Sequence, residues 1–202
     1  MNDVRVEPRK SRAESKAETR KRLLDAARSV FMKIGYHGAT LDMIAAEAGF
    51  TKGALYWHFR NKQAIFLTLI EESIAKNLGA VNSLLAGGTP DEIRKRIGDF
   101  VDGSDDREVL PQFGVELEIE ARHDESFRAI HQVLIVQHEA ALAKFLERYF
   151  EAIGETPKLP IPELTAALLT IFKGFALCRQ NRPDGPVKSG RIVRILLNIP
   201  AD

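Results

Sequence analysis

The sequence is poor in cysteine and contains no long apolar run. Its 202 residues include one cysteine, Cys178, which excludes an intramolecular disulfide. No N-terminal apolar stretch of the signal-peptide kind is present, and no apolar run approaches the length that spans a membrane. We therefore expect a cytoplasmic protein that does not contact a membrane. Cys178 lies in an apolar segment and is most simply a small core residue, with redox sensing as the alternative.

The sequence also lacks the motifs of common catalytic chemistry. It contains no glycine-rich phosphate loop, no nucleophile elbow and no spaced cysteine cluster. Glu120 and His123 form one Glu-x-x-His motif, whereas a di-iron bundle needs two such motifs and two further glutamates. His138-Glu139 lacks the second histidine of a zinc-protease helix. We expect no enzymatic activity, no cofactor and no metal site.

Charge is distributed unevenly along a chain of ordinary globular composition. Hydrophobic residues make up 45% of the sequence and charged residues 28%. Residues 1–62 carry 13 Lys and Arg against 7 Asp and Glu, whereas the remaining residues carry 16 against 21. A basic N-terminal part and an acidic remainder suit a protein that presents one end to polyanionic DNA.

Residues 40–59 predict two short helices joined at Gly49. Thr40 can cap the first helix, Gly49 suits a left-handed helix end, and Thr51 can cap the second helix. Apolar residues recur at helical spacing and give each helix one core-facing side. This is the layout of a helix-turn-helix, in which the second helix lies in the DNA major groove.

The outer face of the second helix would carry Lys52, Gly53, Tyr56, Trp57 and His58. Lys52 is the best candidate for base recognition, and Tyr56 could contact a thymine methyl group or a phosphate. Gly53 would let the backbones approach closely, which accounts for a residue that costs a helix interior about 1 kcal/mol against alanine. Trp57 could support a contact with the DNA backbone or pack into the core of its own domain.

Phosphate contacts are expected from Thr40, Thr51, His58 and Lys62. The Thr51 hydroxyl could bind a phosphate instead of capping its helix, and Thr40 would reach the DNA backbone from the preceding helix. Lys62 follows the predicted cap residue Asn61, and the unpaired amides after this cap offer a phosphate site. His58 could instead be an imidazole that only packs between helices.

These residues resemble the DNA-binding domain of the TetR/AcrR family of bacterial transcriptional regulators. The resemblance rests on residues 40–62, with Gly-Ala-Leu-Tyr-Trp-His-Phe at 53–59 followed by Asn-Lys at 61–62, and on the helix that precedes them. It covers residues 17–78. It implies an all-helical homodimer that acts as a switch, and that leaves or rearranges on DNA when a small molecule binds the C-terminal domain. Repression is the usual mode of the family.

Helical periodicity along the whole chain predicts an all-α protein of about nine helices and no strand. We expect a disordered basic arm at 1–16, a DNA-binding head of three helices with the helix-turn-helix at 17–78, and a ligand-binding and dimerisation bundle at 79–202. Basic residues of the arm could enter a minor groove or form a solvated tail; they are Arg5, Arg9, Lys10 and Arg12.

The last two predicted helices, about 162–180 and 187–198, are apolar around most of their circumference, so something must bury them. Their own domain could do so. The family resemblance instead implies a four-helix interface with a second copy, which we favour because an exposed apolar patch of this size is rare on monomers. Two recognition helices about one DNA turn apart would then contact a palindromic operator in double-stranded DNA.

The resemblance places an effector pocket within the C-terminal bundle, roughly at residues 90–180, and suggests a lipophilic or aromatic effector. Aromatic and polar side chains there could line it, although packing is the more frequent role of an aromatic at helical spacing; they are Phe113, Glu116, Phe127, His131, His138, Phe172 and Phe175. An alternative function is a helical adaptor whose helix-turn-helix makes only protein contacts. Lys52 beside Gly53 and the basic head argue against it.

Overall fold

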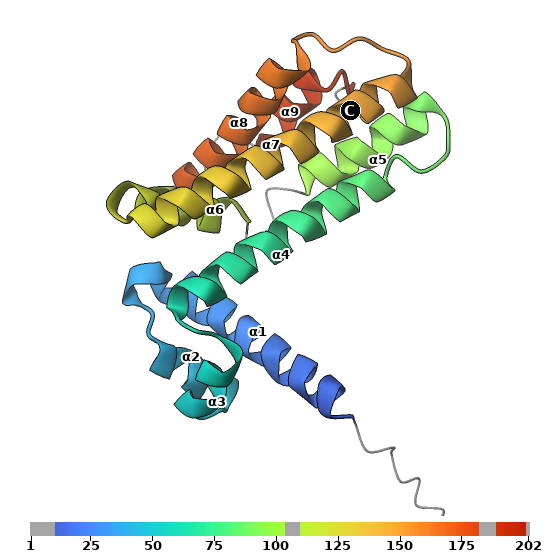
Figure 1. Ribbon diagram of the computed structural model, residues 1–202. Coiled ribbons are helices and arrows are strands. Elements are labelled where there is room, and N and C mark those ends of the chain that lie inside the picture. Colours follow the sequence, from blue (N-terminus) through green and yellow to red (C-terminus); the bar gives the residue numbers. More distant parts are fainter. Residues whose placement is uncertain (1–10, 104–109, 182–188, 201–202) are drawn as a thin grey trace, which may run out of the picture. The chain divides into compact units, whose positions relative to one another are not determined.

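A computed structural model describes residues 11–103, 110–181 and 189–200, and these ranges form nine helices and no strand (Figure 1). In chain order the helices are α1 (Arg12–Gly38), α2 (Leu41–Ala48), α3 (Lys52–His58), α4 (Lys62–Ser83), α5 (Pro90–Asp102), α6 (Leu110–His123), α7 (Glu125–Ile153), α8 (Ile161–Asn181) and α9 (Ser189–Leu196). The predicted all-α fold class is confirmed.

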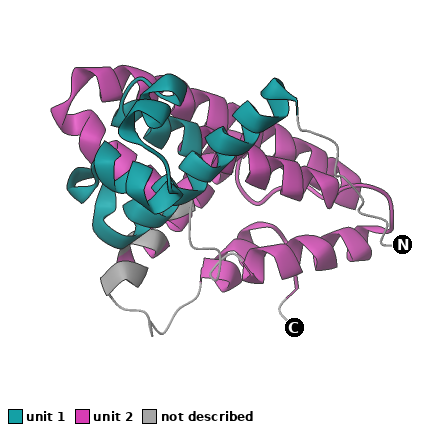
Figure 2. Cartoon of the chain, turned by 90° about the horizontal axis from the view of Figure 1, so that it is seen from below, with its two compact units in different colours: residues 1–69 teal, residues 70–202 magenta. Residues whose placement is uncertain are grey.

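The chain divides into two compact units, unit 1 at Met1–Leu69 and unit 2 at Ile70–Asp202 (Figure 2). Helix α4 therefore begins in unit 1 and ends in unit 2. The domain boundary expected from the sequence, after residue 78, falls later in the same helix.

Helix α1 begins earlier than the sequence analysis expected. Ser11 and Glu14 form a capping box, in which the Ser11 hydroxyl accepts from the Glu14 amide at 3.2 Å and the Glu14 carboxylate accepts from the Ser11 amide at 2.7 Å. Residues 12–16, expected in a disordered arm, are consequently helical. Arg5, Arg9 and Lys10 lie outside the described residues, and Arg12 lies exposed in the first turn of the helix.

The predicted start and end signals of the helix-turn-helix are confirmed. Thr40 Oγ1 accepts from the Met43 amide at 3.2 Å, and Thr51 Oγ1 accepts from the Ala54 amide at 3.3 Å. Gly49 ends α2 in the left-handed conformation with φ 71°, which a side chain would disfavour. The chain therefore turns sharply between the two helices, as a helix-turn-helix requires.

A small aromatic core packs α1 against α4 in unit 1. Phe31 and Phe66 are fully buried and meet edge to face with ring centroids 5.4 Å apart. Leu55 is fully buried on the inner face of α3. This burial fixes the rotation of α3 and so decides which of its side chains face outward.

Helices α5, α7, α8 and α9 share the core of unit 2, with Ile97, Leu146, Leu164 and Val193 among its buried residues. The hydroxyl of the buried Tyr149 donates to the Leu197 carbonyl oxygen at 2.9 Å. This bond satisfies a polar group that would otherwise be costly to bury, and it fixes the chain just beyond α9 against α7.

Much of the apolar face of α9 is covered within its own unit, the alternative that the sequence analysis weighed against burial by a second copy. Helix α9 packs against α5 and α8, and Val193, Leu197 and Ile199 are buried. The packing against α5 is close: a Cβ atom at Gly98 would lie 2.9 Å from the Arg194 guanidinium, which is bound to the Asp102 carboxylate. Ile195 of the same helix is 56% exposed, so the packing within unit 2 leaves the expected interface with a second copy untested.

Helix α8 has one buried and one exposed face. Leu164 and Leu168 lie in the core, whereas Ala166, Thr170 and Cys178 are exposed. Cys178 was expected in the core and lies instead on the exposed face. Two steps of four residues separate it from Thr170, so both lie on the same side of the helix.

Among the helices of the described ranges, none combines the length and the apolar character that a membrane span needs.

Candidate nucleic-acid interface and ligand cavity

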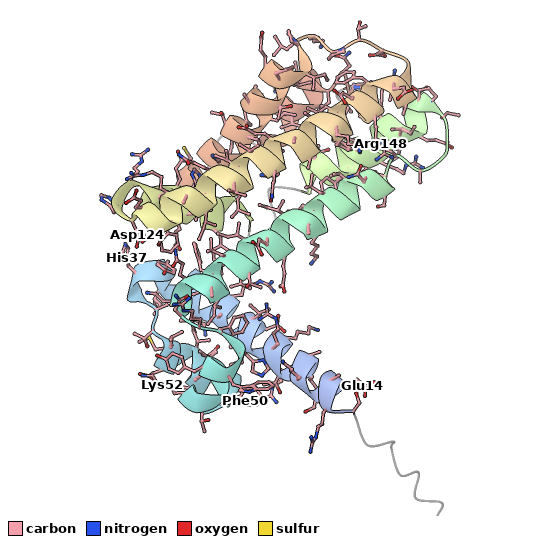
Figure 3. The ribbon with its side chains drawn as sticks, viewed as in Figure 1. Glu14, His37, Phe50, Lys52, Asp124 and Arg148 are labelled. Carbon is pink, nitrogen blue, oxygen red and sulfur yellow. The ribbon has the colours of Figure 1, made fainter. Side chains whose placement is uncertain are left out.

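The outer face of α3 exposes the side chains that the sequence analysis placed there. Lys52 is exposed, as are Tyr56 and Trp57, and 66% of the Trp57 surface is accessible. Trp57 thus lies outside the core, contrary to one of its two predicted roles. Figure 3 labels Lys52 on α3 and Phe50 in the turn that precedes it.

Lys52 forms an exposed ion pair with Asp42 of α2. Lys52 Nζ lies 2.9 Å from Asp42 Oδ2, and the hydrogen bond to this carboxylate, followed by its charge, raises the pKa of Lys52. An exposed pair contributes little to stability. It does hold the ammonium toward the start of α3, where base contacts of a recognition helix are made.

Gly53 faces open space. A Cβ atom built at this position would find only Thr51 Oγ1 within 4 Å, at 3.9 Å. Packing within unit 1 therefore does not require a glycine in this helix. A surface that approaches α3 from outside would require it, because a missing side chain allows the closest contact between backbones.

Basic side chains of α1 lie over aromatic rings of the helix-turn-helix. Lys16 Nζ lies 4.4 Å from the centroid of the Trp57 ring, and the Arg20 guanidinium lies 4.3 Å from that of Phe59. Lys16 is therefore a member of the outer face that sequence analysis missed, because the residue was placed in the disordered arm. The Ser-x-x-Glu capping box at residues 11–14 was the signal that could have found it.

His58 is half-buried beside Trp57, and their ring centroids lie 4.8 Å apart. Burial is the main cause that lowers the pKa of His58, and the positive charges of Lys16 and Arg20 lower this pKa further. Its Nδ1 atom is buried and has no hydrogen-bond partner in the described part of the chain. A neutral imidazole can offer a phosphate one N–H group but no charge.

Lys62 is engaged within unit 1. Its ammonium donates to the carbonyl oxygens of Tyr36 at 2.7 Å and Ala39 at 2.9 Å, and it lies 4.3 Å from the centroid of the Tyr36 ring. These carbonyls belong to the end of α1 and the residue after it, which Lys62 joins to the start of α4. A phosphate contact by Lys62 would have to share or break these bonds. Thr40 and Thr51 are both exposed and remain accessible beside their caps.

Unit 2 contains a cavity of about 350 Å³, partly open to solvent, that is lined by residues of α4, α5, α6, α7, α8 and α9. Most of its lining is apolar, and α4 contributes Ile70, Ile74, Leu78 and Val81. Of the predicted pocket residues, Phe172 and His138 line this cavity. The sequence analysis missed α4 because it sought the pocket only from residue 90 onward.

The other predicted pocket residues lie elsewhere in unit 2. Phe113 and Phe127 are buried in packing between helices, whereas Glu116, His131 and Phe175 are half-buried and are not among the residues that line the cavity. Burial, followed by the charge of Lys173, lowers the pKa of His131. In the described residues, no group of three or more His, Cys, Asp or Glu side chains could hold a metal ion.

A shallow groove lies between α7 and α8 on the surface of unit 2. Its walls are mostly small or apolar; they are Val136, Glu139, Ala140, Ala143, Pro162, Thr165 and Ala166. Val136 is 63% exposed, and Val133, one turn earlier on α7, is exposed as well. Apolar side chains of α7 therefore meet solvent beside this groove.

Comparison with known proteins finds similarity to bacterial regulatory proteins. Residues 23–69 match the family described as bacterial regulatory proteins, tetR family. Over 62 residues the chain is 50% identical to the uncharacterised HTH-type transcriptional regulator TtgW of Pseudomonas putida, a match that covers 31% of this chain and 46% of TtgW. The chain thus matches less than half the length of that relative.

Two further similarities extend beyond the helix-turn-helix. The chain is 29% identical over 162 residues to the HTH-type transcriptional repressor AcnR of Corynebacterium glutamicum, covering 78% of this chain and 79% of AcnR. The crystal structure of the transcriptional regulator FadR from Bacillus subtilis in complex with stearoyl-CoA matches with a TM-score of 0.62 at 16% identity, covering 88% of this chain and 95% of FadR. At this identity the second similarity is one of fold.

Proposed function

This chain belongs to the tetR family of bacterial regulatory proteins, and we propose that it is a ligand-responsive regulator of transcription rather than an enzyme. It binds a palindromic DNA operator as a homodimer in the cytoplasm, represses transcription, and is released by a small lipophilic effector. One observation carries the proposal: the exposed face of α3 combines Lys52, Tyr56 and Trp57 with a glycine that unit 1 itself does not need.

The side chains of this face divide into base and phosphate contacts. Lys52 exchanges Asp42 for a base edge and donates to guanine, and Tyr56 contacts a thymine methyl group or a phosphate. Thr40 and Thr51 donate to phosphates while their oxygens continue to cap α2 and α3. Lys16, Trp57 and His58 form a neighbouring contact to the DNA backbone.

Lys62 takes a positioning role in this proposal. Its bonds to the carbonyl oxygens of Tyr36 and Ala39 fasten the start of α4 to the end of α1. A displacement of α4 is therefore transmitted directly to the first helix of unit 1. Effector binding can act through this connection, because α4 lines the cavity with four apolar side chains farther along the same helix.

The homodimer forms through the exposed faces of α7 and α8. On α7, Ala129, Val133, Val136, Ala140 and Ala143 follow one another at steps of four, three, four and three residues. This is the spacing of a seam between helices packed side by side, and its small residues permit a close approach. The groove beside Val136 continues the surface onto α8, so two copies would form a four-helix interface.

The structural similarity to FadR supports a lipophilic effector, since that protein was crystallised with stearoyl-CoA. The mostly apolar lining and the volume of about 350 Å³ fit the usual range of small-molecule sites. A ligand in this cavity would touch α4 together with the helices of unit 2, which is what coupling to unit 1 requires.

DNA binding is the first property to test. Full-length protein is titrated into fluorescently labelled DNA that flanks its own gene, and anisotropy is followed at two salt concentrations. Quenching of Trp57, the single tryptophan, gives an independent signal from α3. We expect saturable binding that survives random competitor DNA and weakens with salt. An absence of binding even at low salt would overturn the proposal and favour a protein-binding adaptor.

A further inference from the structure

The charged side chains in the described lining of the unit 2 cavity are all basic. Two lysines and a histidine, Lys76, Lys173 and His138, are among the residues that line it, and no carboxylate is among its described lining residues. We propose that the cavity binds an amphiphile with a carboxylate head group, held by Lys173 and His138, and an apolar tail that lies against α4. The assignment rests on the proposed function only in treating this ligand as the effector.

Lys173 is the principal anchor. Its ammonium lies 3.1 Å from Glu118 Oε2, and Glu118 belongs to α6 and is not among the lining residues of the cavity. An ammonium carries three N–H donors, and this ion pair occupies one of them. A ligand carboxylate can therefore share Lys173 with Glu118 or replace it. Replacement exchanges one carboxylate for another and leaves no buried charge without a partner.

His138 lies on α7 and lines the same cavity as Lys173 of α8. Burial is the main reason that its pKa is lowered; the charge of Lys173 acts in the same direction and that of Glu139 opposes it. Its imidazole is consequently neutral near neutral pH and adds a single N–H donor to the site. Two donors on facing helices, one charged and one neutral, suit the two oxygens of a carboxylate.

The same arrangement disfavours other head groups. A cationic head would enter a site that already contains the Lys173 ammonium and whose described lining supplies no carboxylate to balance it. A neutral head would keep the apolar contacts with Ile70, Ile74 and Phe172 but would give Lys173 no charged acceptor. The cavity should therefore rank ligands of equal tail in the order anionic, neutral, cationic.

Three probes with the same ten-carbon tail test this ranking: decanoate, decanol and decyltrimethylammonium. Binding to the full-length protein is measured by titration calorimetry in the absence of DNA. We expect decanoate to bind about tenfold more tightly than decanol, which is the scale of one charge-assisted hydrogen bond, and decyltrimethylammonium not to saturate. Equal binding of all three, binding of none, or a preference for the cation would overturn the assignment.

Two substitutions locate the head group. Lys173→Met keeps the length of the side chain but removes its charge, and should weaken decanoate about tenfold while leaving decanol unchanged. Lys144→Met, at an exposed position of α7, is the matched control. Unchanged decanoate binding by Lys173→Met would contradict the proposal. If that variant does not fold, Glu118→Gln carries the test, because removing the competing carboxylate should strengthen decanoate binding several-fold.

The ligand and the regulator are tested separately. Failure of all three probes with intact operator binding would reject the carboxylate ligand and leave the DNA-binding function standing. Selective decanoate binding without any DNA binding would retain the site and reject the regulator. If both hold, decanoate should release the protein from its operator, and Lys173→Met should need about tenfold more decanoate for the same release.

Discussion

The Lys52 ammonium lies 2.9 Å from the Asp42 carboxylate, so the residue that we propose contacts a base is held by a side chain of the preceding helix. The two helices meet at the turn around Gly49, and the ion pair crosses that turn. In the proposed complex with DNA, Asp42 would therefore have two opposite effects on binding. Its negative charge repels phosphates, whereas its hydrogen bond orients Lys52.

Replacing Asp42 separates these two effects. We expect Asp42→Asn to bind random DNA more tightly, because a negative charge beside the DNA backbone is lost. The ratio of operator to random affinity should fall, because Lys52 loses its orienting partner. Anisotropy titrations on both DNAs at fixed salt measure this ratio. Asp91→Asn, in an exposed position of unit 2, should change neither affinity, and an unchanged ratio in Asp42→Asn would contradict an orienting role.

Gly53→Ala should change stability and DNA binding in opposite directions. The open space around Gly53 accommodates a methyl group, so the substitution should stabilise the protein by up to about 1 kcal/mol through helix propensity. DNA affinity should fall, because the methyl group occupies the surface that meets the DNA. Gly79→Ala in α4 is the control, since a Cβ atom there meets nothing within 4 Å. Gly79→Ala should stabilise the protein without weakening DNA binding. Urea unfolding measures the stability, and anisotropy measures the DNA affinity.

Lys62 and Lys16 should differ in how they affect binding. Lys62→Met removes bonds to two carbonyl oxygens and should lower the free energy of unfolding by about 2 kcal/mol, with little change in the salt dependence of DNA binding. Lys16→Ala should leave stability nearly unchanged and lower the logarithmic salt slope by about 1, the value for one phosphate contact. A reduced slope for Lys62→Met would instead support the phosphate contact expected from the sequence.

Two aspartate substitutions distinguish a subunit interface on α7 from one on α9. Val136→Asp places a charge in the exposed seam of α7 and should dissociate the dimer, because an unpaired carboxylate would be buried between the copies. Ile195→Asp places the same charge on α9, where the side chain is 56% exposed, and should leave the dimer intact. Light scattering after gel filtration reports the mass. Dissociation by Ile195→Asp alone would restore α9 as the interface.

Stability should fall as the pH is lowered from about 7 to about 5, before most carboxylates titrate. The pKa of His138 is lowered in the folded protein, mainly by burial, so the unfolded chain binds a proton more readily over this range. His131 and His58 act in the same direction. His138→Leu should flatten the dependence of melting temperature on pH, whereas His123→Gln, at an exposed position, should not. A steeper dependence in His138→Leu would be inconsistent with this explanation.

Helix positions that depend on local signals could be predicted from the sequence. Helix α7 has such signals at both ends, because Asp124 caps its start through the amides of Ser126 and Phe127 and Gly154 ends it in the left-handed conformation. The helix-turn-helix followed in the same way from Thr40, Gly49 and Thr51. The start of α1 carried an equally local signal in its capping box, and it was missed because the surrounding residues are charged and lack apolar periodicity.

Features that depend on distant partners could not be predicted in this way. The burial of α9 is determined by α5, about 90 residues earlier, where Gly98 leaves room for the Arg194 side chain that binds Asp102. The cavity combines side chains of α4 with those of α7 and α8, and nothing in the local pattern of α4 separates a cavity wall from ordinary core. The sequence context of Lys62 predicts a phosphate contact, whereas the carbonyl partners that support its proposed positioning role come from residues 23 and 26 positions earlier.

The helix caps of unit 1 also bear on the order in which the chain folds during synthesis. Ser11, Thr40, Thr51 and Asn61 each accept a backbone N–H three residues ahead, so every helix of this unit has its start encoded within one turn. Chains rich in such short-range contacts fold rapidly, and N-terminal parts fold first as they leave the ribosome. We expect a nascent chain of this protein to acquire a folded α3 before the ribosome has translated the seam of α7. It would then be a DNA-competent monomer before it can pair.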